Sequence, residues 1–546
     1  MPDNALSAAP HDILKAALTH ARSGNFADAA VLCEHLLAQG DPDAEAFHLL
    51  GVLRNIQGRH AEAEPLLRQA IARQPGTAKY HSNLANALRG LERPDEAEAS
   101  YRRALALDPE FDDACANLAR LLLDLSRWDA AIAEYEHLVR RNPGDTPSRI
   151  RLAHLLQSGN RLVESEAAAS AGLLADPANP ALNLIVAICE RRTQRFEQAR
   201  QRFQHIDASR LDRDLASVFH YERGLLHDRL DELAPAFADF SEANRLQAVL
   251  ASERGVDATR YLDELDRLAR LDLGGLRGEP ETLAGHTSAP VFLVGFPRSG
   301  TTLLDQILDS HPRIQTLEEK PIIGLLCDDM DRLVADRPNG LADLRADERA
   351  RLRALYYEYA ADFLELRPDT LLVDKYPLNL TRLPYILAIF PDARFILALR
   401  HPADCVLSCF MHLFAPNDAM ANFYTLEDAA ALYARVMGLW RHWAENLPLR
   451  HHRVHYEHLV QDLPGEVRPL LDFLGLEWTE DMVRPHEHAA RRGYINTPSH
   501  SQVTQPIYQR AAGRWQRYRP WLENVTGTLQ PYLEYFGYTD QGDPGA

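Results

Sequence analysis

The sequence is poor in cysteine and carries an excess of negative charge, and both features exclude classes of protein. Its six cysteines among 546 residues are scattered without a C-x-x-C pair, so we expect neither a disulfide framework nor a cysteine zinc site. The formal net charge of −19 argues against broad binding to nucleic acid or to an anionic membrane. A polyanionic ligand would therefore need a local group of basic residues.

Long apolar segments are also missing. No run approaches the roughly 18 apolar residues that a membrane-spanning helix needs, and residues 1–12 have neither the basic nor the apolar region of a secretory signal. We therefore expect a cytoplasmic protein with reduced thiols and no membrane partner. Because single cores seldom grow beyond about 250 to 300 residues, we also expect more than one domain.

Residues 1–245 contain an internal repeat of 34 residues, seen in one column of prolines and two columns of small residues. The columns are Pro75, Pro109, Pro143 and Pro177; Gly51, Ala85, Ala119, Ala153 and Ala187; and Ala63, Ala97, Ala131, Ser165 and Ala199. Small residues in two successive helices allow a helical hairpin to pack closely, and a proline after the second helix ends it. The 34-residue period and the residue types in these columns resemble the tetratricopeptide repeat. Weaker matches at both ends extend the array to about seven repeats.

Such an array predicts an all-α solenoid whose concave groove binds a protein or peptide. The alternative is that these helices only pack against the rest of the chain or mediate self-association, and a homodimer is left open. Residues 246–289 begin as a helical linker and then become rich in Gly and Pro, which places a domain boundary there.

A strand, a turn and a helix are expected in succession between Pro290 and Pro312, in the sequence P-V-F-L-V-G-F-P-R-S-G-T-T-L-L-D-Q-I-L-D-S-H-P. Backbone amides of a Gly-rich turn at a helix N-terminus suit a phosphate or a sulfate. Gly295 and Gly300 have the spacing of a Walker A loop, but Thr301 stands at the lysine position. A kinase or NTPase is therefore disfavoured, and the loop suits a short anionic group.

Three further apolar runs end in polar residues and are each followed by a helix-like stretch. They are Thr370 to Pro377, Arg394 to Pro402 and Arg453 to Leu459. This alternation predicts an α/β domain over residues 290–540 with a parallel sheet, whose ligand lies at the carboxyl ends of the strands.

The motifs P-R-S-G-T-T, D-K-Y-P and R-H-P-x-x-x-x-x-S, in this order, resemble sulfotransferases that use 3′-phosphoadenosine-5′-phosphosulfate (PAPS). Within that superfamily they are most similar to tyrosylprotein sulfotransferases and to bacterial proteins that join tetratricopeptide repeats to such a domain. The resemblance implies the P-loop-like sulfotransferase fold, PAPS as donor and adenosine-3′,5′-bisphosphate (PAP) as product.

The resemblance also implies roles for individual residues. The 5′-phosphosulfate would be held by Pro297, Arg298, Ser299, Gly300, Thr301 and Thr302. Arg400 and Ser408 would hold the 3′-phosphate, and we expect Ser408 at the start of a helix. Glu319 is expected as the general base, with Glu318 as the alternative, and Lys375 beside the bridging oxygen.

Two more residues follow from the resemblance. Ser499, with Ser501 as the alternative, would lie near the transferring group, and Arg514 would contact the nucleotide. Residues 491–519 alternate arginines with aromatics and suggest either a lid over the nucleotide or a solvated basic face.

The acceptor is less determined than the donor. The tyrosylprotein branch usually has a basic residue two positions after its base, where this chain has Pro321. Tyrosine of a protein or peptide remains the preferred acceptor, and a glycan or small-molecule hydroxyl stays open, as does a non-catalytic repeat scaffold that binds nucleotide. No metal is expected, because the late histidines such as His451, His452 and His455 lack helical ligand spacing.

Overall fold

The computed structural model describes residues 9–39, 43–277, 289–337, 339–483 and 511–539. The chain packs as two compact units, Met1–Ile206 and Asp207–Ala546. All six cysteines are buried free thiols. Within the described residues, no helix has the length and apolar character needed to cross a membrane.

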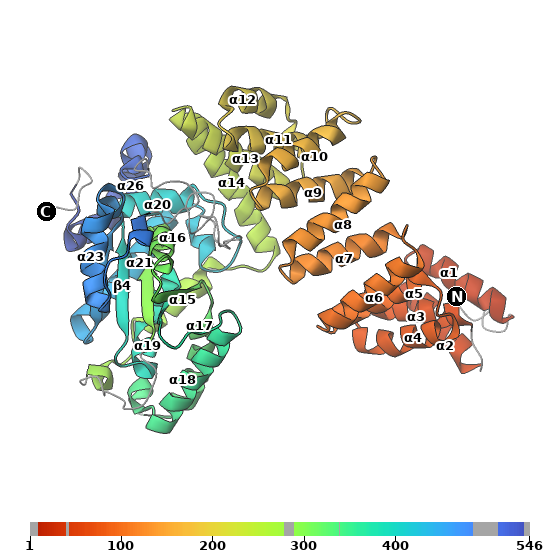
Figure 1. Cartoon of the computed structure of the whole chain (residues 1–546), viewed down its shortest axis with the longest axis horizontal. Helices are drawn as coiled ribbons and strands as arrows, with labels where there is room; N and C mark the ends of the chain where they lie inside the picture. Colours follow the sequence, from red (N-terminus) through yellow and green to blue (C-terminus); the bar gives the residue numbers. More distant parts are fainter. Residues whose placement is uncertain (1–8, 40–42, 278–288, 338, 484–510, 540–546) are drawn as a thin grey trace. The chain divides into compact units, whose positions relative to one another are not determined.

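The first unit consists of helical hairpins that follow one another in chain order (Figure 1). Its helices are α1 Pro10–Arg22, α2 Phe26–Ala38, α3 Ala44–Ile56, α4 His60–Arg73, α5 Ala78–Gly90, α6 Pro94–Leu107, α7 Asp112–Asp124, α8 Trp128–Arg141, α9 Thr146–Ser158, α10 Leu162–Leu173, α11 Pro180–Arg192 and α12 Phe196–His205. The predicted helical repeats are confirmed.

The two small-residue columns lie where the helices of each hairpin meet. The Ala and Ser members of both columns are fully buried. A Cβ on Gly51 of α3 would lie 2.7 Å from Leu67 Cγ of α4, which is closer than atoms can approach. In a later hairpin the Ser165 hydroxyl donates to the Ala153 carbonyl at 2.7 Å. The columns are therefore small because the two helices touch at these positions.

A left-handed backbone residue recurs in the turn inside each hairpin. These residues have φ between 57° and 79° and follow one another at 34-residue intervals: Gly24, Gly58, Glu92, Ser126, Asn160 and Gln194. Asp231 repeats this conformation with φ 62°, after an inserted 3₁₀ turn at Ala208–Arg210. The hairpin of α13 (Arg213–Arg229) and α14 (Leu233–Glu253) therefore continues the repeat pattern, although it packs within the second unit.

The second unit surrounds one parallel sheet. Its strands are β1 Val291–Gly295, β2 Ile314–Glu318, β3 Leu371–Lys375, β4 Arg394–Leu399 and β5 Arg450–His455. Besides α13 and α14, its α-helices are α15 Ala258–Leu268, α16 Thr301–Asp309, α17 Ile322–Val334, α18 Ala346–Ala361, α19 Leu383–Ile389, α20 Pro402–Phe410, α21 Leu426–Asn446, α22 Tyr456–Gln461, α23 Leu463–Leu474 and α26 Arg519–Phe536.

The strand order is β2-β3-β1-β4-β5, and all four pairings are parallel, as predicted. The predicted runs at β1, β3 and β4 are confirmed, whereas β2 was not predicted. The strand expected over Arg453 to Leu459 is misplaced: β5 ends at His455, and Tyr456 begins α22. The physical reason is that the His455 N–H donates to the Glu466 carboxylate at 2.6 Å instead of continuing the strand.

Alternate strand residues face two different cores. Val291, Leu293 and their strand neighbours pack with residues of α16, α22 and α23 on one face. Phe292 and Val294 face the larger core, which includes α17–α21 and α26 and extends to α14 and α15. The sheet is thus covered on both faces, and only its strand ends can carry a site.

Helix α14 packs directly on the sheet-containing part of the second unit. Phe237 stacks on Phe410 and on Trp521, with ring centroids 5.1 and 5.2 Å apart. Asn244 Nδ2 donates to the Phe410 carbonyl at 2.9 Å. The compact units divide before residue 245, where the repeat pattern ends, and the domain limits 1–245, 246–289 and 290–540 remain predictions.

Candidate active site

The turn between β1 and α16 is shaped by two glycines and a left-handed arginine. A Cβ on Gly295 would lie 2.6 Å from Ser299 Oγ and 2.7 Å from the Ala398 carbonyl, so the turn closes tightly only without a side chain there. Gly300 has φ 98°, and Arg298 has φ 68°, a conformation that costs a non-glycine residue free energy. The turn is therefore tight, and it leads directly into the N-terminus of α16.

Three hydroxyls lie at the same place. Ser299, Thr301 and Thr302 are buried, with 2%, 4% and 8% of their surfaces exposed. Among the described residues Ser299 Oγ is a buried polar atom without a hydrogen-bond partner. A buried hydroxyl without a partner is costly, and an anionic ligand in the turn would satisfy it.

Arg298 and Arg400 follow the adjacent strands β1 and β4 and are linked to each other and to Ser408. Arg298 Nε donates to Ser408 Oγ at 3.3 Å, and Arg400 Nη1 donates to the Arg298 carbonyl at 3.1 Å. Burial lowers the pKa of Arg400, but the combined electrostatic effect of Asp404 and of Tyr456, Cys405 and Glu457 outweighs burial and raises the pKa above its ordinary value. Both guanidinium groups are therefore positioned by the protein before any ligand binds.

Ser408 does not occupy the part of its helix that the sequence predicted. It lies in the last turn of α20, Pro402–Phe410, and not at the start. The prediction was wrong because the helix begins directly at the proline that follows His401. Backbone amides at the helix start therefore cannot assist Ser408, and its hydroxyl and the neighbouring Arg298 must make the contacts.

Tyr456 forms one wall of this arrangement and was missed by the sequence analysis. Its ring lies 5.0 Å from the Arg400 guanidinium carbon, and a Cβ on Gly300 would approach its Cδ2 to 2.6 Å. The sequence could have indicated Tyr456, because it is the first residue after β5, at the carboxyl edge where the other site residues lie.

Lys375 ends β3 and faces two glutamates. Its side chain is fully buried, and Nζ lies 2.7 Å from Glu319 Oε1 and 3.3 Å from Glu318 Oε1. Glu318 is the register partner of Lys375 across β2 and β3. The backbone of Glu319 leaves the strand in a left-handed conformation with φ 50°, and its N–H donates to the Lys375 carbonyl at 2.7 Å. The Glu319 side chain is 34% exposed and that of Glu318 only 12%.

The adjacent Asp374 points into the opposite core. Tyr356 OH donates to Asp374 Oδ2 at 2.8 Å, and burial raises the pKa of Asp374 to about 7. A surface pair between Asp374 and Lys375 is therefore excluded, since both side chains are fully buried on different faces. Lys375 instead faces Glu318 and Glu319 at the strand end.

The chain returns to this edge at residues 511–515. Arg400 Nη2 donates to the Ala511 carbonyl, and the Asp404 carboxylate accepts the N–H groups of Gly513 and Trp515, each at 2.8 Å. The Trp515 ring stacks on His401 with centroids 4.5 Å apart and an interplanar angle of 5°. Asp404 was missed from the sequence, although it sits between Arg400 and Ser408.

Arg514 pairs with a carboxylate of α13, while its chain neighbours Gly513 and Trp515 donate to Asp404 beside Arg400. Its Nη2 is 2.8 Å from Asp228 Oδ2 in α13, and Tyr518 OH donates to the same carboxylate at 2.9 Å. Ser499 and Ser501 lie outside the described residues. The structure thus places Arg298, Ser299, Gly300, Glu319, Lys375, Arg400 and Ser408 at one edge of the sheet, and their roles remain predictions.

The class of the second unit is shown by comparison with protein families. Residues 290–480 match the model of the sulfotransferase family, and residues 43–110 and 88–155 match models of the tetratricopeptide repeat. The chain therefore joins tetratricopeptide repeats to a sulfotransferase-family domain, as the motifs indicated.

Two known proteins are each similar to this chain over less than half of its length. Protein-tyrosine sulfotransferase 1 of Danio rerio is 27% identical over 271 residues, which are 46% of this chain and 73% of that protein. An uncharacterized protein of Aquifex aeolicus is 30% identical over 254 residues, 45% of this chain, and the chain spans only 33% of its length.

Two solved structures are similar to part of this chain, with low TM-scores. The Pseudomonas aeruginosa protein PilF is 18% identical, with a TM-score of 0.31 over 37% of this chain and 91% of that one. A tetratricopeptide repeat protein from Parabacteroides merdae is 17% identical, with a TM-score of 0.34 over 43% and 93% of the two chains.

Proposed function

We propose that this protein transfers a sulfuryl group from PAPS to a hydroxyl acceptor, and that the acceptor is tyrosine of a protein or peptide. The observation that carries the proposal is the ion pair of Lys375 and Glu319, 2.7 Å long, at the carboxyl edge of the sheet that also carries the turn of Arg298 and Ser299. A cation for a leaving group and a carboxylate for an incoming hydroxyl are the two groups that this transfer requires.

The residues of the turn fit a phosphosulfate. Ser299 supplies a buried hydroxyl without a partner, and glycine at 295 and 300 keeps side chains out of the turn. Arg298 brings a positive charge, and the N-terminus of α16 adds the favourable end of a helix dipole. No lysine follows the second glycine, which favours a ligand shorter than a nucleoside triphosphate.

In the proposed reaction Glu319 takes the proton from the acceptor hydroxyl as that oxygen attacks sulfur. The bond between sulfur and the bridging oxygen breaks, and the negative charge of that oxygen develops beside Lys375, while Arg298 neutralises the 5′-phosphate. Attraction from Asp305, Glu319 and Glu318 outweighs burial and raises the pKa of Lys375, so the lysine is charged at neutral pH.

Glu319 is preferred over Glu318 as the base. An acceptor hydroxyl arrives from solvent and must reach an oxygen of the base directly. Glu319 exposes 34% of its side chain and lies beyond the strand end, whereas Glu318 exposes 12% and remains part of β2.

Arg400 and Ser408 are proposed to bind the 3′-phosphate that distinguishes PAPS from other adenine nucleotides. Arg400 has one guanidinium nitrogen, Nε, that is buried without a hydrogen-bond partner among the described residues. A phosphate within reach of that nitrogen and of the Ser408 hydroxyl would satisfy it.

The tyrosine acceptor is supported by the relatives and by the repeats. Protein-tyrosine sulfotransferases of Danio rerio and Drosophila melanogaster are similar to part of this chain. Tetratricopeptide repeats commonly bind peptides in their concave groove, which suits a polypeptide substrate. A cytoplasmic location stays a prediction, in keeping with six free thiols.

Thermal unfolding with two nucleotides tests the donor site. PAP should raise the melting temperature, whereas ATP with Mg²⁺ should not, because only PAP carries the 3′-phosphate. Equal stabilisation by both would contradict the proposal. The acceptor is tested separately by radiolabelled sulfate transfer from PAPS to a tyrosine peptide library and a glycan panel. PAP binding without transfer to any acceptor would favour the non-catalytic scaffold.

A further inference from the structure

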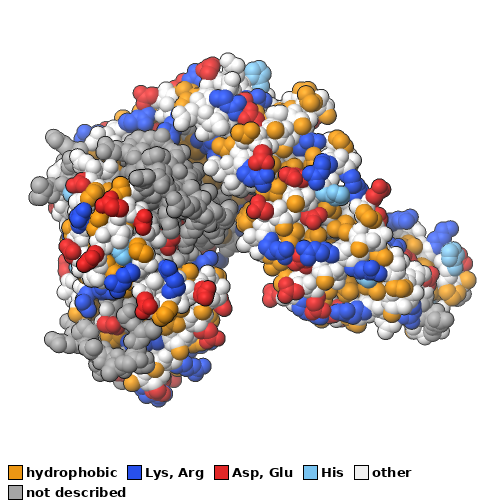
Figure 2. Space-filling model, in the orientation of Figure 1, with side chains coloured by type: hydrophobic (Ala, Val, Ile, Leu, Met, Phe, Trp, Pro, Cys, Tyr) orange, Lys and Arg blue, Asp and Glu red, His pale blue; other side chains and the backbone are white. Residues whose placement is uncertain are grey.

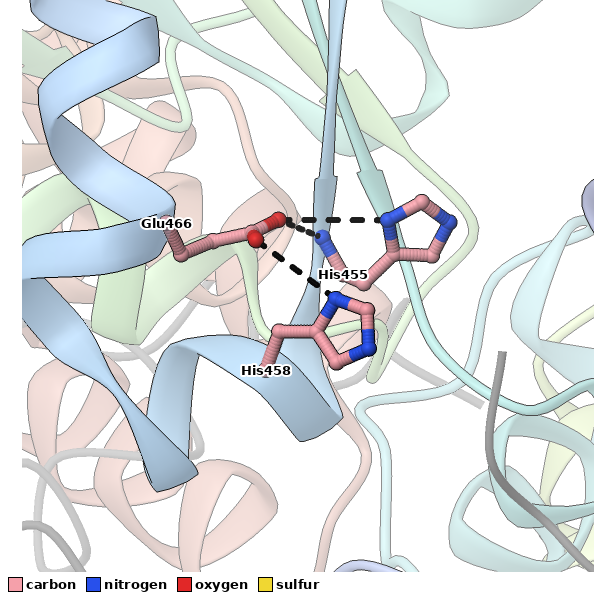
Figure 3. Close-up of side chains that lie close together, drawn as sticks. All are labelled: His455, His458 and Glu466. Atoms are coloured by element: carbon pink, nitrogen blue, oxygen red, sulfur yellow. Dashed lines mark hydrogen bonds and ion pairs between the residues drawn. The ribbon is translucent and has the colours of Figure 1, made fainter. Parts of the chain in front are cut away.

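Two histidines and a glutamate converge at the edge strand of the sheet. His455 is the last residue of β5, His458 lies in the short helix α22, and Glu466 lies in the first turn of α23. Their potential ligand atoms all lie within 4.8 Å of one another. Figure 3 shows both imidazole rings turned toward the carboxylate, each through Nδ1.

Backbone contacts fix the carboxylate in this position. Glu466 Oε1 accepts the His455 N–H at 2.6 Å, so the carboxylate is held beside the end of the strand. Helix α23 is started by Asp462, whose Oδ1 accepts the Gly465 N–H at 3.0 Å. The three side chains therefore come from three elements whose relative positions are set by the backbone.

The distances from the imidazoles to the carboxylate are longer than hydrogen bonds and close to the spacing of two ligands of one ion. His455 Nδ1 is 3.8 Å from Glu466 Oε1, and His458 Nδ1 is 3.6 Å from Oε2. Both exceed the roughly 3.2 Å limit of an N–H···O hydrogen bond. Two ligand atoms that are each about 2.1 Å from one ion lie about 3.4 Å apart at the tetrahedral angle.

We propose that His455, His458 and Glu466 bind a divalent ion of the zinc class. Two imidazole nitrogens and one carboxylate oxygen suit Zn²⁺ or Co²⁺, whereas Mg²⁺ and Ca²⁺ prefer oxygen ligands alone. Three protein ligands leave one position for water. No metal was expected from the sequence, because the histidines lack helical ligand spacing and supporting cysteines, whereas the fold brings Glu466 beside His455 and His458.

The site lies next to the proposed donor site and is separate from its chemistry. His455 directly precedes Tyr456, whose ring lies beneath the Arg400 guanidinium and against Gly300. A bound ion would join the end of β5 to α22 and α23 and would hold the backbone of Tyr456 in place. Sulfuryl transfer as proposed above does not use the ion.

Metal titration of the full-length protein tests the site. After dialysis against a chelator, the protein should bind one Co²⁺ with the visible absorption of a tetrahedral or five-coordinate site, and Zn²⁺ should displace it. His458→Asn and Glu466→Gln should each weaken binding at least about 10-fold. Glu466→Gln keeps an acceptor for the His455 N–H, and the His458 side chain is 38% exposed, so both variants should fold.

His442→Asn is the matched control, because His442 is an exposed histidine of α21 outside the cluster. It should bind Co²⁺ as the unchanged protein does. Zn²⁺ should raise the melting temperature of the unchanged protein and of His442→Asn, but not of His458→Asn. Absence of one-to-one binding, or binding by His458→Asn equal to that of the unchanged protein, would overturn the proposal.

Discussion

Lys375 Nζ and Glu319 Oε1 lie 2.7 Å apart, and the lysine of this pair is completely buried while the glutamate is partly open to solvent. The lysine is anchored inside the sheet, at the end of β3 between β2 and β1. The glutamate stands just beyond β2 in a left-handed conformation. This asymmetry suggests a fixed cation for the donor and an accessible carboxylate for the acceptor, and it makes the two glutamates experimentally separable.

Glu319→Gln is expected to lower the rate of sulfate transfer by about 10²- to 10⁴-fold, because the amide cannot take the proton of the acceptor. PAP binding, measured by calorimetry, should change little. Glu318→Gln is the matched variant, since its carboxylate faces the same lysine from a more buried position. A large loss of rate in Glu318→Gln with activity retained in Glu319→Gln would reverse the assignment.

Ser408→Ala should weaken the binding of PAP by about 10- to 100-fold and leave the binding of AMP unchanged, since a hydrogen bond to a charged phosphate is lost. Ser299→Ala should weaken both ligands, because Ser299 lies in the turn proposed for the 5′ group. Calorimetric titration of both nucleotides against both variants checks this pattern. Equal effects of Ser408→Ala on the two nucleotides would exclude its contact with the 3′-phosphate.

Gly300→Ala should abolish nucleotide binding and lower the melting temperature. The added methyl would lie 2.6 Å from the Tyr456 ring, and the φ of 98° is unfavourable for alanine. Gly527→Ala in α26 is the control, because no atom lies within 4 Å of its added Cβ. That helical substitution should be neutral or stabilise by about 0.5 to 1 kcal/mol. Calorimetric binding of PAP together with thermal unfolding distinguishes the two variants.

Asp374→Asn should make the melting temperature less sensitive to pH. The pKa of Asp374 is about 7 in the folded protein, raised by burial, and near 3.9 in an unfolded chain. Between these values the folded state binds more protons, so the unchanged protein loses stability as the pH rises from about 4 to 7. The variant cannot titrate and should gain up to about 4 kcal/mol relative to the unchanged protein across this range.

Differential scanning calorimetry at pH 5 and pH 8 checks this, with the exposed Asp369→Asn as control. Identical pH profiles of Asp374→Asn and the unchanged protein would show that Asp374 does not titrate in this range.

Asp228→Asn should destabilise the second unit by about 2 to 3 kcal/mol. Asp228 is largely buried, pairs with Arg514 at 2.8 Å and accepts from Tyr518 OH, so its loss leaves buried donors without a charged partner. Asp231→Asn is the control, because Asp231 pairs only with Arg517 in the described contacts and is 80% exposed. It should change stability by less than about 0.5 kcal/mol. Thermal unfolding of both variants gives the comparison.

Surface charge offers little further guidance to partners. On the face drawn in Figure 2, basic and acidic side chains are interspersed over the repeat helices and form no single basic patch. This pattern agrees with the net charge of −19 and with the expectation of no nucleic-acid partner, which remains a prediction.

The sequence by itself determined the repeat architecture and the tight turn between β1 and α16. In a hairpin repeat the packing is visible in the sequence, because a position such as Ala85 must hold a small residue where two helices touch. The glycines at 295 and 300 indicated the turn from their spacing alone, although Ala398 and Tyr456, which the fold places against them, also require glycine there. Such local constraints appear in the sequence as fixed spacings between residues of one type. The parallel sheet was predicted from the alternation of strand-like and helix-like segments.

Tertiary structure decided which distant residues meet. The Lys375–Glu319 pair, the Tyr456 wall and the binding of residues 511–515 by Asp404 all join segments far apart in the chain. The same holds for Arg514, which pairs with a repeat helix, and for Glu466, which completes the histidine cluster. No local sequence pattern predicts these contacts, because they depend on how β2, β5 and the helices pack against one another. The contacts of Lys375 and Glu319 therefore come from the fold, whereas the turn between β1 and α16 was predicted from the sequence.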